Sequence, residues 1–157
     1  MDIRERDAIK VKGLWRFVWW EDGQEVRVQE EENLVVASGL SVIASLLVYE
    51  RTNNLPWFLA WGTNTTPAAN DNVKLGNESS RKLVSTKDRS ANTVARIRTF
   101  LLKSEAVGLW REWGLFVAGT SEIGSGTLFN RILPAGGTNK TGNQVLTVQV
   151  DISFSAG

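Results

Sequence analysis

Two clusters of carboxylates, Glu21-Asp22 and Glu30-Glu31-Glu32, are the side chains best suited to catalysis in this sequence. Two carboxylates cleave a glycosidic bond only when they face each other across the sugar at about 5 to 10 Å, with one held in an apolar pocket that raises its pKa. Both clusters adjoin a predicted turn or strand end, where carboxylates are solvated. We therefore interpret them as surface charges.

The residue types that most often perform catalysis or bind metals are missing, because the sequence has no histidine and no cysteine. Their absence removes the commonest general base, the thiolate nucleophile and the usual zinc ligands. Asn70-Asp71-Asn72 offers oxygens for calcium but lacks the bidentate acid that ends a calcium loop. Gly124-Ser125-Gly126-Thr127 lacks the lysine of a phosphate-binding loop. We expect no enzyme, no cofactor and no metal site.

The 18 basic and 17 acidic residues nearly cancel and are scattered along the chain. No basic cluster indicates a nucleic-acid or anionic-membrane surface, so protein partners are favoured. Residues 1–7 alternate in charge and have no apolar run, unlike a secretory signal. The most apolar window covers about 16 residues, fewer than the ~20 needed to cross a membrane. We expect no nucleic-acid partner and no membrane span.

Only one long segment has the periodicity of a helix, about residues 34–50. Asn33 precedes it as a candidate N-cap. Apolar residues recur at the i, i+3, i+4, i+7 spacing of one buried stripe, formed by Leu40, Ile43, Ala44 and Leu47. A single helix with one apolar stripe needs a sheet to cover, and the remaining segments should supply that sheet.

Those remaining segments show the period of two that is typical of strands. The expected strands are Val11–Trp20, Glu25–Glu31, Leu55–Gly62, Arg81–Lys87, Thr93–Lys103, Leu109–Ala118, Thr127–Leu133 and Gln144–Phe154. In the first strand, Trp15, Phe17 and Trp19 share one face, and Leu14, Arg16, Val18 and Trp20 share the other. In the second strand Val26 and Val28 are expected to point inward, and in the last strand Leu146, Val148, Val150, Ile152 and Phe154 share one face. Asp22-Gly23 is a hairpin signal, whereas residues 63–72 and 134–143 are expected to be loops.

Short strands with one helix among them favour a mainly β fold, an antiparallel β-sandwich or barrel with one α-helix. An α+β roll is the alternative. Residues 1–10 are expected to form a flexible N-terminal arm, either disordered or ordered against a neighbouring subunit. Residues 11–157 are expected to form a single β-rich domain.

Tryptophan occurs seven times and suggests an interface. Trp19 and Trp20 are adjacent, so their side chains leave the strand on opposite faces and only one can join the core. A helix or loop covers the other, or it contacts a neighbouring subunit, since tryptophan is enriched at interfaces. The interface residues that we expect are Ile3, Arg4, Arg6, Trp20, Trp57 and Trp110. A tryptophan surface that stacks on sugars is the alternative.

Short motifs follow one another along most of the chain. They are Asn33-Leu34-Val35-Val36 with Gly39-Leu40, WGTNTTPAANDNVKLGNESSRK at 61–82, Glu112-Trp113-Gly114-Leu115-Phe116, Gly126-Thr127-Leu128-Phe129-Asn130-Arg131 and Gln149-Val150-Asp151-Ile152. In this order they resemble the NLVxxxGL, GTGTTAP…DTxLxxE…R, E-x-GLF, G-T-L-F-x-R and LTVxWxI segments of small virion proteins of tailed bacteriophages.

This resemblance implies a non-enzymatic building block of a phage particle. A capsid decoration or cement subunit is expected, with a tail, neck or fibre component or a host-glycan-binding module as alternatives. The implied partners are other virion proteins, either the major capsid protein or tail proteins. The implied assembly is a homotrimer in the virion, put together in the host cytoplasm. The motif charges Glu78, Arg81, Glu112 and Arg131 are expected to form ion pairs that tie the long loop to the sheet.

Overall fold

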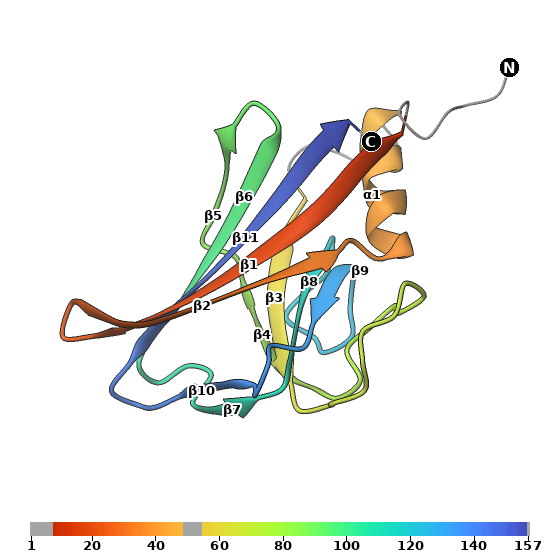
Figure 1. Cartoon of the computed structure of the whole chain (residues 1–157). Coiled ribbons are helices and arrows are strands. Elements are labelled where there is room, and N and C mark those ends of the chain that lie inside the picture. The colour runs from red at the N-terminus through yellow and green to blue at the C-terminus, as the bar shows by residue number, and fades with distance from the viewer. Residues whose placement is uncertain (1–7, 49–54, 157) are drawn as a thin grey trace, which may run out of the picture.

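The computed structural model describes residues 8–48 and 55–156, and this part of the chain is mainly β with one α-helix (Figure 1). The strands are β1 (Ile9–Glu21), β2 (Gln24–Leu34), β3 (Trp57–Gly62), β4 (Glu78–Leu83), β5 (Thr86–Ala91), β6 (Val94–Leu101), β7 (Gly108–Trp110), β8 (Glu112–Val117), β9 (Thr127–Ile132), β10 (Thr138–Lys140) and β11 (Val145–Ala156). The helix α1 (Ala37–Leu47) lies between β2 and β3 in the sequence.

The larger sheet has five strands in the order β2-β1-β11-β6-β5, all antiparallel to their neighbours (Figure 1). β1 and β11 pair along almost their whole length, from Ile9 opposite Ala156 to Trp20 opposite Val145. The β1–β2 hairpin turns at Asp22-Gly23, and both residues have positive φ, as the Asp-Gly signal predicted.

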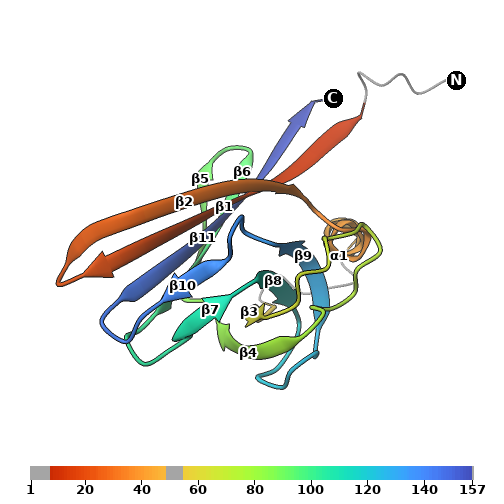
Figure 2. The same ribbon diagram turned by 60° about the horizontal axis from the view of Figure 1, so that its bottom comes forward.

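The smaller sheet has four strands in the order β4-β3-β8-β9 and lies against one face of the larger sheet (Figure 2). β7 and β10 form a separate two-stranded ladder. Each of the two main sheets ends in free edge strands, so the sheets stack as an open sandwich and do not close into a barrel. The sandwich alternative of the predicted fold class is therefore confirmed.

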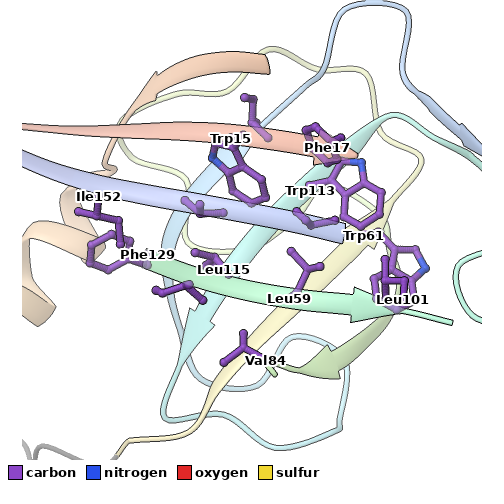
Figure 3. Packing of buried hydrophobic residues seen from close by; sticks show 14 of the residues in the cluster. Trp15, Phe17, Leu59, Trp61, Val84, Leu101, Trp113, Leu115, Phe129 and Ile152 are labelled. Atoms are coloured by element: carbon purple, nitrogen blue, oxygen red, sulfur yellow. The ribbon is translucent and has the colours of Figure 1, made fainter. Parts of the chain in front are cut away.

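Aromatic rings dominate the core between the two sheets (Figure 3). The ring of Trp113 lies 5.4 Å from that of Phe17 and 5.8 Å from that of Trp61. Its indole N–H donates to Thr138 Oγ1 at 2.8 Å, which satisfies the polar atom of a fully buried ring. The alternation predicted for the first and last strands is confirmed, and the structure shows which face points inward. The buried residues are Trp15, Phe17, Trp19, Leu146, Val148, Val150 and Ile152.

The prediction for the start of the helix was wrong. Asn33 lies in β2 rather than at the N-cap, and Val36 occupies the N-cap without a side-chain hydrogen bond. The Asn33 amide is used elsewhere: its Oδ1 accepts from Trp15 Nε1 at 3.2 Å, and its Nδ2 donates to the Arg131 carbonyl at 2.9 Å. Residues 49 and 50, at the predicted end, lie outside the described residues.

The predicted buried stripe of the helix was wrong at three of its four positions: Ile43 packs against the core, but Leu40, Ala44 and Leu47 are exposed. The buried helix residues are Gly39, Val42 and Ser45. The helix lies beside the edge strand β9, and the Ser38 hydroxyl donates to the Leu128 carbonyl at 2.5 Å. A helix that approaches a strand's backbone this closely needs small residues on the contact face, which a pattern of large apolar residues does not reveal.

The face assigned to the second strand was wrong too. Val26 and Val28 are 49% and 41% exposed instead of buried. β2 is an edge strand with a register shift opposite Trp19 and Trp20, and the guanidinium of its residue Arg27 lies 4.6 Å from the centroid of Trp19. A cation over the ring covers this part of the core in place of an apolar side chain.

Two predicted strands are each divided in the structure. The segment expected as Arg81–Lys87 contributes to β4 in one sheet and β5 in the other, so the chain crosses between the sheets near Val84. The segment expected as Leu109–Ala118 is split at Arg111 into β7 and β8. The loop expected at 134–143 contains β10. A segment that crosses from one sheet to the other keeps the alternating pattern of a strand. The sequence therefore did not show where one strand ends and the next begins.

Gly39 gives the first stability prediction. A Cβ at this position would overlap the Phe129 carbonyl oxygen and would lie 2.6 Å from Val35 Cγ1. Gly39→Ala should therefore push the helix away from β9 and lower the free energy of unfolding by about 1–3 kcal/mol, as overpacking does. Urea denaturation measures this change. Ser41→Ala, at an exposed position of the same helix, is the matched control and should leave the midpoint unchanged or slightly higher.

Candidate functional site

A buried ion pair joins two of the motif segments. Arg131 of β9 donates from Nε to Glu112 Oε2 at 3.0 Å, and its Nη2 lies 2.9 Å from the same oxygen. The two side chains are 3% and 0% exposed, so both charges are removed from water. Burial of this kind is tolerated only when the remaining polar atoms also find partners.

Those partners come from the loop at residues 63–77. Glu112 Oε1 accepts from the Asn77 amide at 2.7 Å and the Asn64 amide at 3.2 Å, and Oε2 accepts from the Gly76 amide at 2.9 Å. Arg131 Nη2 donates to the Thr66 carbonyl at 2.9 Å. The ion pair therefore holds both ends of the long loop against the sheet, and the predicted tie between loop and sheet is confirmed.

A second ion pair holds a different loop. Arg81 Nε and Nη2 donate to the two carboxylate oxygens of Glu78 at 2.7 and 2.8 Å, and both side chains are almost fully buried. Arg81 Nη1 also donates to the Ser125 carbonyl at 2.8 Å, and the guanidinium lies 4.4 Å from the centroid of Phe116. The predicted pairing is confirmed, but this pair anchors residues 119–126 rather than the long loop.

Three of the carboxylates considered in the sequence are paired with arginine in the structure. Glu78 and Glu112 are both bound by arginine, and Glu30 of the acidic cluster lies 3.1 Å from Arg16 on an exposed face. Across residues 8–48 and 55–156, no group of three acidic, histidine or cysteine side chains is arranged to hold a metal ion. The arrangement of motif charges is suited to holding loops in place.

Three of the six predicted interface residues, Trp20, Trp57 and Trp110, are in the described part of the chain, and they lie at separate places on the fold. Ile3, Arg4 and Arg6 lie outside the described residues. Trp57, at the start of β3, packs on Phe129 with 5.0 Å between ring centroids. Trp110 lies 6.4 Å from Trp61, at the other end of β3.

Trp20 lies apart from the other tryptophans, on the outer face of the larger sheet. Its indole N–H donates to Thr147 Oγ1 at 3.1 Å, and its side chain is half-buried. No described element forms a further layer over this face (Figure 2).

Trp20 borders a cleft of about 230 Å³, which we call the outer cleft. Its lining residues are Arg16, Val18, Trp20, Arg98, Phe100, Thr147 and Gln149, from β1, β6 and β11. Val18 is buried at 5% exposure, whereas Phe100 is 40% exposed. Arginine and aromatic side chains around a small apolar surface are the composition of protein interface hot spots.

Some features of the outer cleft could be predicted from the sequence. Arg98 and Phe100 alternate with inward residues of β6, so their shared outward face was predictable. Their position beside Trp20 was not, because β11, more than forty residues later in the sequence, lies between β6 and β1 and brings them together.

A second depression, lined in part by Trp61, Lys82, Glu105 and Trp110, has a volume of about 440 Å³. Lys82 Nζ lies 2.6 Å from Glu105 Oε2. Burial favours the neutral form of Glu105, but hydrogen bonds from Lys82 and the Leu102 amide outweigh it, so the pKa of this carboxyl is lowered. We call this depression the Trp110 groove.

Comparison of the chain with protein-family models, with curated proteins and with solved structures finds no match. Within the described residues, no helix is both long enough and apolar enough to pass through a bilayer.

Proposed function

We propose that this chain is a structural protein of a tailed-bacteriophage particle, a decoration or cement subunit that binds and stabilises neighbouring capsid subunits. Its partners are the major capsid protein or tail proteins, and its assembly is a homotrimer in the virion. The proposed role is non-enzymatic and needs no cofactor or metal. A place in the tail, neck or fibre is the alternative within the same class.

The network around Glu112 is the observation that most supports this proposal. Three motif segments that are distant in the sequence, at 61–82, 112–116 and 126–131, meet at the Glu112–Arg131 pair. The motif residues therefore act together as one structural unit, as expected if they encode a common scaffold rather than a catalytic set. A scaffold held by buried ion pairs presents rigid loops, which lowers the entropy cost of binding a neighbour.

The uncovered face of the larger sheet is the surface that we assign to contacts with neighbouring subunits. It combines Trp20 and Phe100 with Arg16 and Arg96, which are paired to acids, and with Arg98, which has no acidic partner among the described residues. Aromatic and arginine side chains are enriched at protein interfaces.

Particle binding tests the proposed function. Mass spectrometry of purified particles should detect many copies of the chain. The purified protein should also co-sediment with particles produced by a phage whose gene for this protein has been deleted. The arm was predicted to cover residues 1–10, but Ile9 and Lys10 belong to β1 and pair with Ala156 and Ser155. Removal of residues 1–7, which precede this strand, should weaken co-sedimentation by at least about tenfold, since the arm would contribute contacts outside the sandwich. An intact unfolding transition of the truncated chain is the control. Absence of the chain from purified particles would contradict the proposal.

A host-glycan-binding module is the second candidate, and the Trp110 groove is the observation that favours it. An indole beside lysine, glutamate and serine side chains offers a stacking surface with hydrogen-bonding groups around it. A glycan array separates the two candidates. The glycan-binding module would be favoured if the wild type binds a glycan, the Trp110→Ala variant does not, and the Trp57→Ala variant still does. Trp57 is the control because it lies at the opposite end of β3.

A further inference from the structure

The outer cleft has a cationic group that the described residues do not neutralise. On the same face, Arg16 lies 3.1 Å from Glu30, and Arg96 lies 2.9 Å from Asp151. Arg98 donates only to the neutral amide oxygen of Gln149 at 3.0 Å, and no described carboxylate forms an ion pair with it. A partner that brings a carboxylate to Arg98 would pair this arginine with an acid, as Arg16 and Arg96 already are.

The cleft also fixes where an apolar group should lie relative to that carboxylate. Phe100 and Arg98 are two residues apart on β6 and point to the same face of the sheet. Through the register of β11, Val18 of β1 lies in line with Phe100, and Arg16 lies in line with Arg98. A complementary extended segment therefore needs an apolar residue and an acid two positions apart, because an extended chain repeats its side-chain direction every second residue.

Residues 1–7 of this chain have that spacing. In an extended conformation Ile3, Glu5 and Asp7 lie on one face, while Arg4 and Arg6 lie on the other. Ile3 opposite Phe100 and Glu5 opposite Arg98 would run antiparallel to β6. Asp7 would then approach Arg96.

The arm of the same copy is too short to make this contact. Ile3 lies five residues before Ala8, so it reaches at most about 18 Å from the start of the described chain. Val18, at the level of Phe100, lies ten residues further along β1, about 33 Å in a strand. The occupant must therefore come from another copy.

We propose that the N-terminal arm of one copy binds the outer cleft of a neighbouring copy, with Ile3 against Trp20 and Phe100 and with Glu5 paired to Arg98. The copies are held together because the arm of each copy binds the cleft of a neighbour. It goes beyond the proposed function and does not need a particle, so self-association of the purified chain tests it separately from particle binding.

The experiment measures self-association of the full-length chain by sedimentation velocity across a range of concentrations. The wild-type chain should associate. Arg98→Glu and Glu5→Arg should each weaken association by at least about tenfold, because each places like charges together. An equimolar mixture of the two variants should associate more strongly than either variant alone, because the arm of each variant meets a cleft of opposite charge on the other variant. Arg111→Glu, at an exposed position outside the cleft, is the matched control and should behave as the wild type.

Recovery in the mixture separates the proposed contact from damage to the fold, because a misfolded variant would not regain association when mixed. Equal unfolding midpoints of the single variants check the same point. A wild-type chain that stays monomeric would overturn the proposal. Equal association of the wild type and Arg98→Glu, or a mixture as weak as the single variants, would also overturn it.

Discussion

Glu112→Gln is expected to be among the most destabilising single substitutions in this protein, lowering the free energy of unfolding by about 3–5 kcal/mol. The substitution leaves the buried Arg131 guanidinium without its counter-charge. A glutamine amide also has only one oxygen, whereas the carboxylate accepts hydrogen bonds through both oxygens from Asn64, Gly76 and Asn77. Urea denaturation followed by tryptophan fluorescence measures the loss.

A control and a double variant show whether the unpaired buried charge causes the loss of stability in Glu112→Gln. Glu122→Gln, at an exposed position, should change the free energy of unfolding by less than about 0.5 kcal/mol. The double variant Glu112→Leu with Arg131→Met should lose less than the sum of the two single changes, because no unpaired charge stays buried. A strictly additive result would show that the two charges do not stabilise each other.

Trp113→Ala is expected to cost about 3–5 kcal/mol through loss of a large buried ring. The side chain is fully buried, contacts the rings of Phe17 and Trp61, and bonds to Thr138 of β10. Since small domains are stable by only about 5–15 kcal/mol, the thermal unfolding midpoint should fall by many degrees. Differential scanning calorimetry measures this shift.

Trp113→Phe separates the two contributions of this residue. It keeps an aromatic ring in the core but loses the indole N–H, which leaves Thr138 Oγ1 without its donor and some space unfilled. The expected cost is about 1–2 kcal/mol, well below that of the alanine variant. If both variants had the midpoint of the wild type, the ring would not be part of the rigid core.

The anchoring charges of the site could be predicted from the sequence, whereas the outer cleft could not. Glu112 and Arg131 were identified from their motifs, and the structure joins them over loop 63–77. The outer cleft depends on three strands that are far apart in the chain. Trp20 was expected at an interface, but nothing local to β1 indicates that Arg98 and Phe100 stand beside it.

The sequence by itself determined the mainly β class, the hairpin at Asp22-Gly23 and which residues of β1 and β11 share a face. Each of these follows from local alternation or from the backbone preference of two adjacent residues. Only the tertiary structure decided the face of the helix and the exposure of Val26 and Val28. The reason is that burial at a sheet edge depends on what packs there: α1 approaches the backbone of β9, and Arg27 covers Trp19.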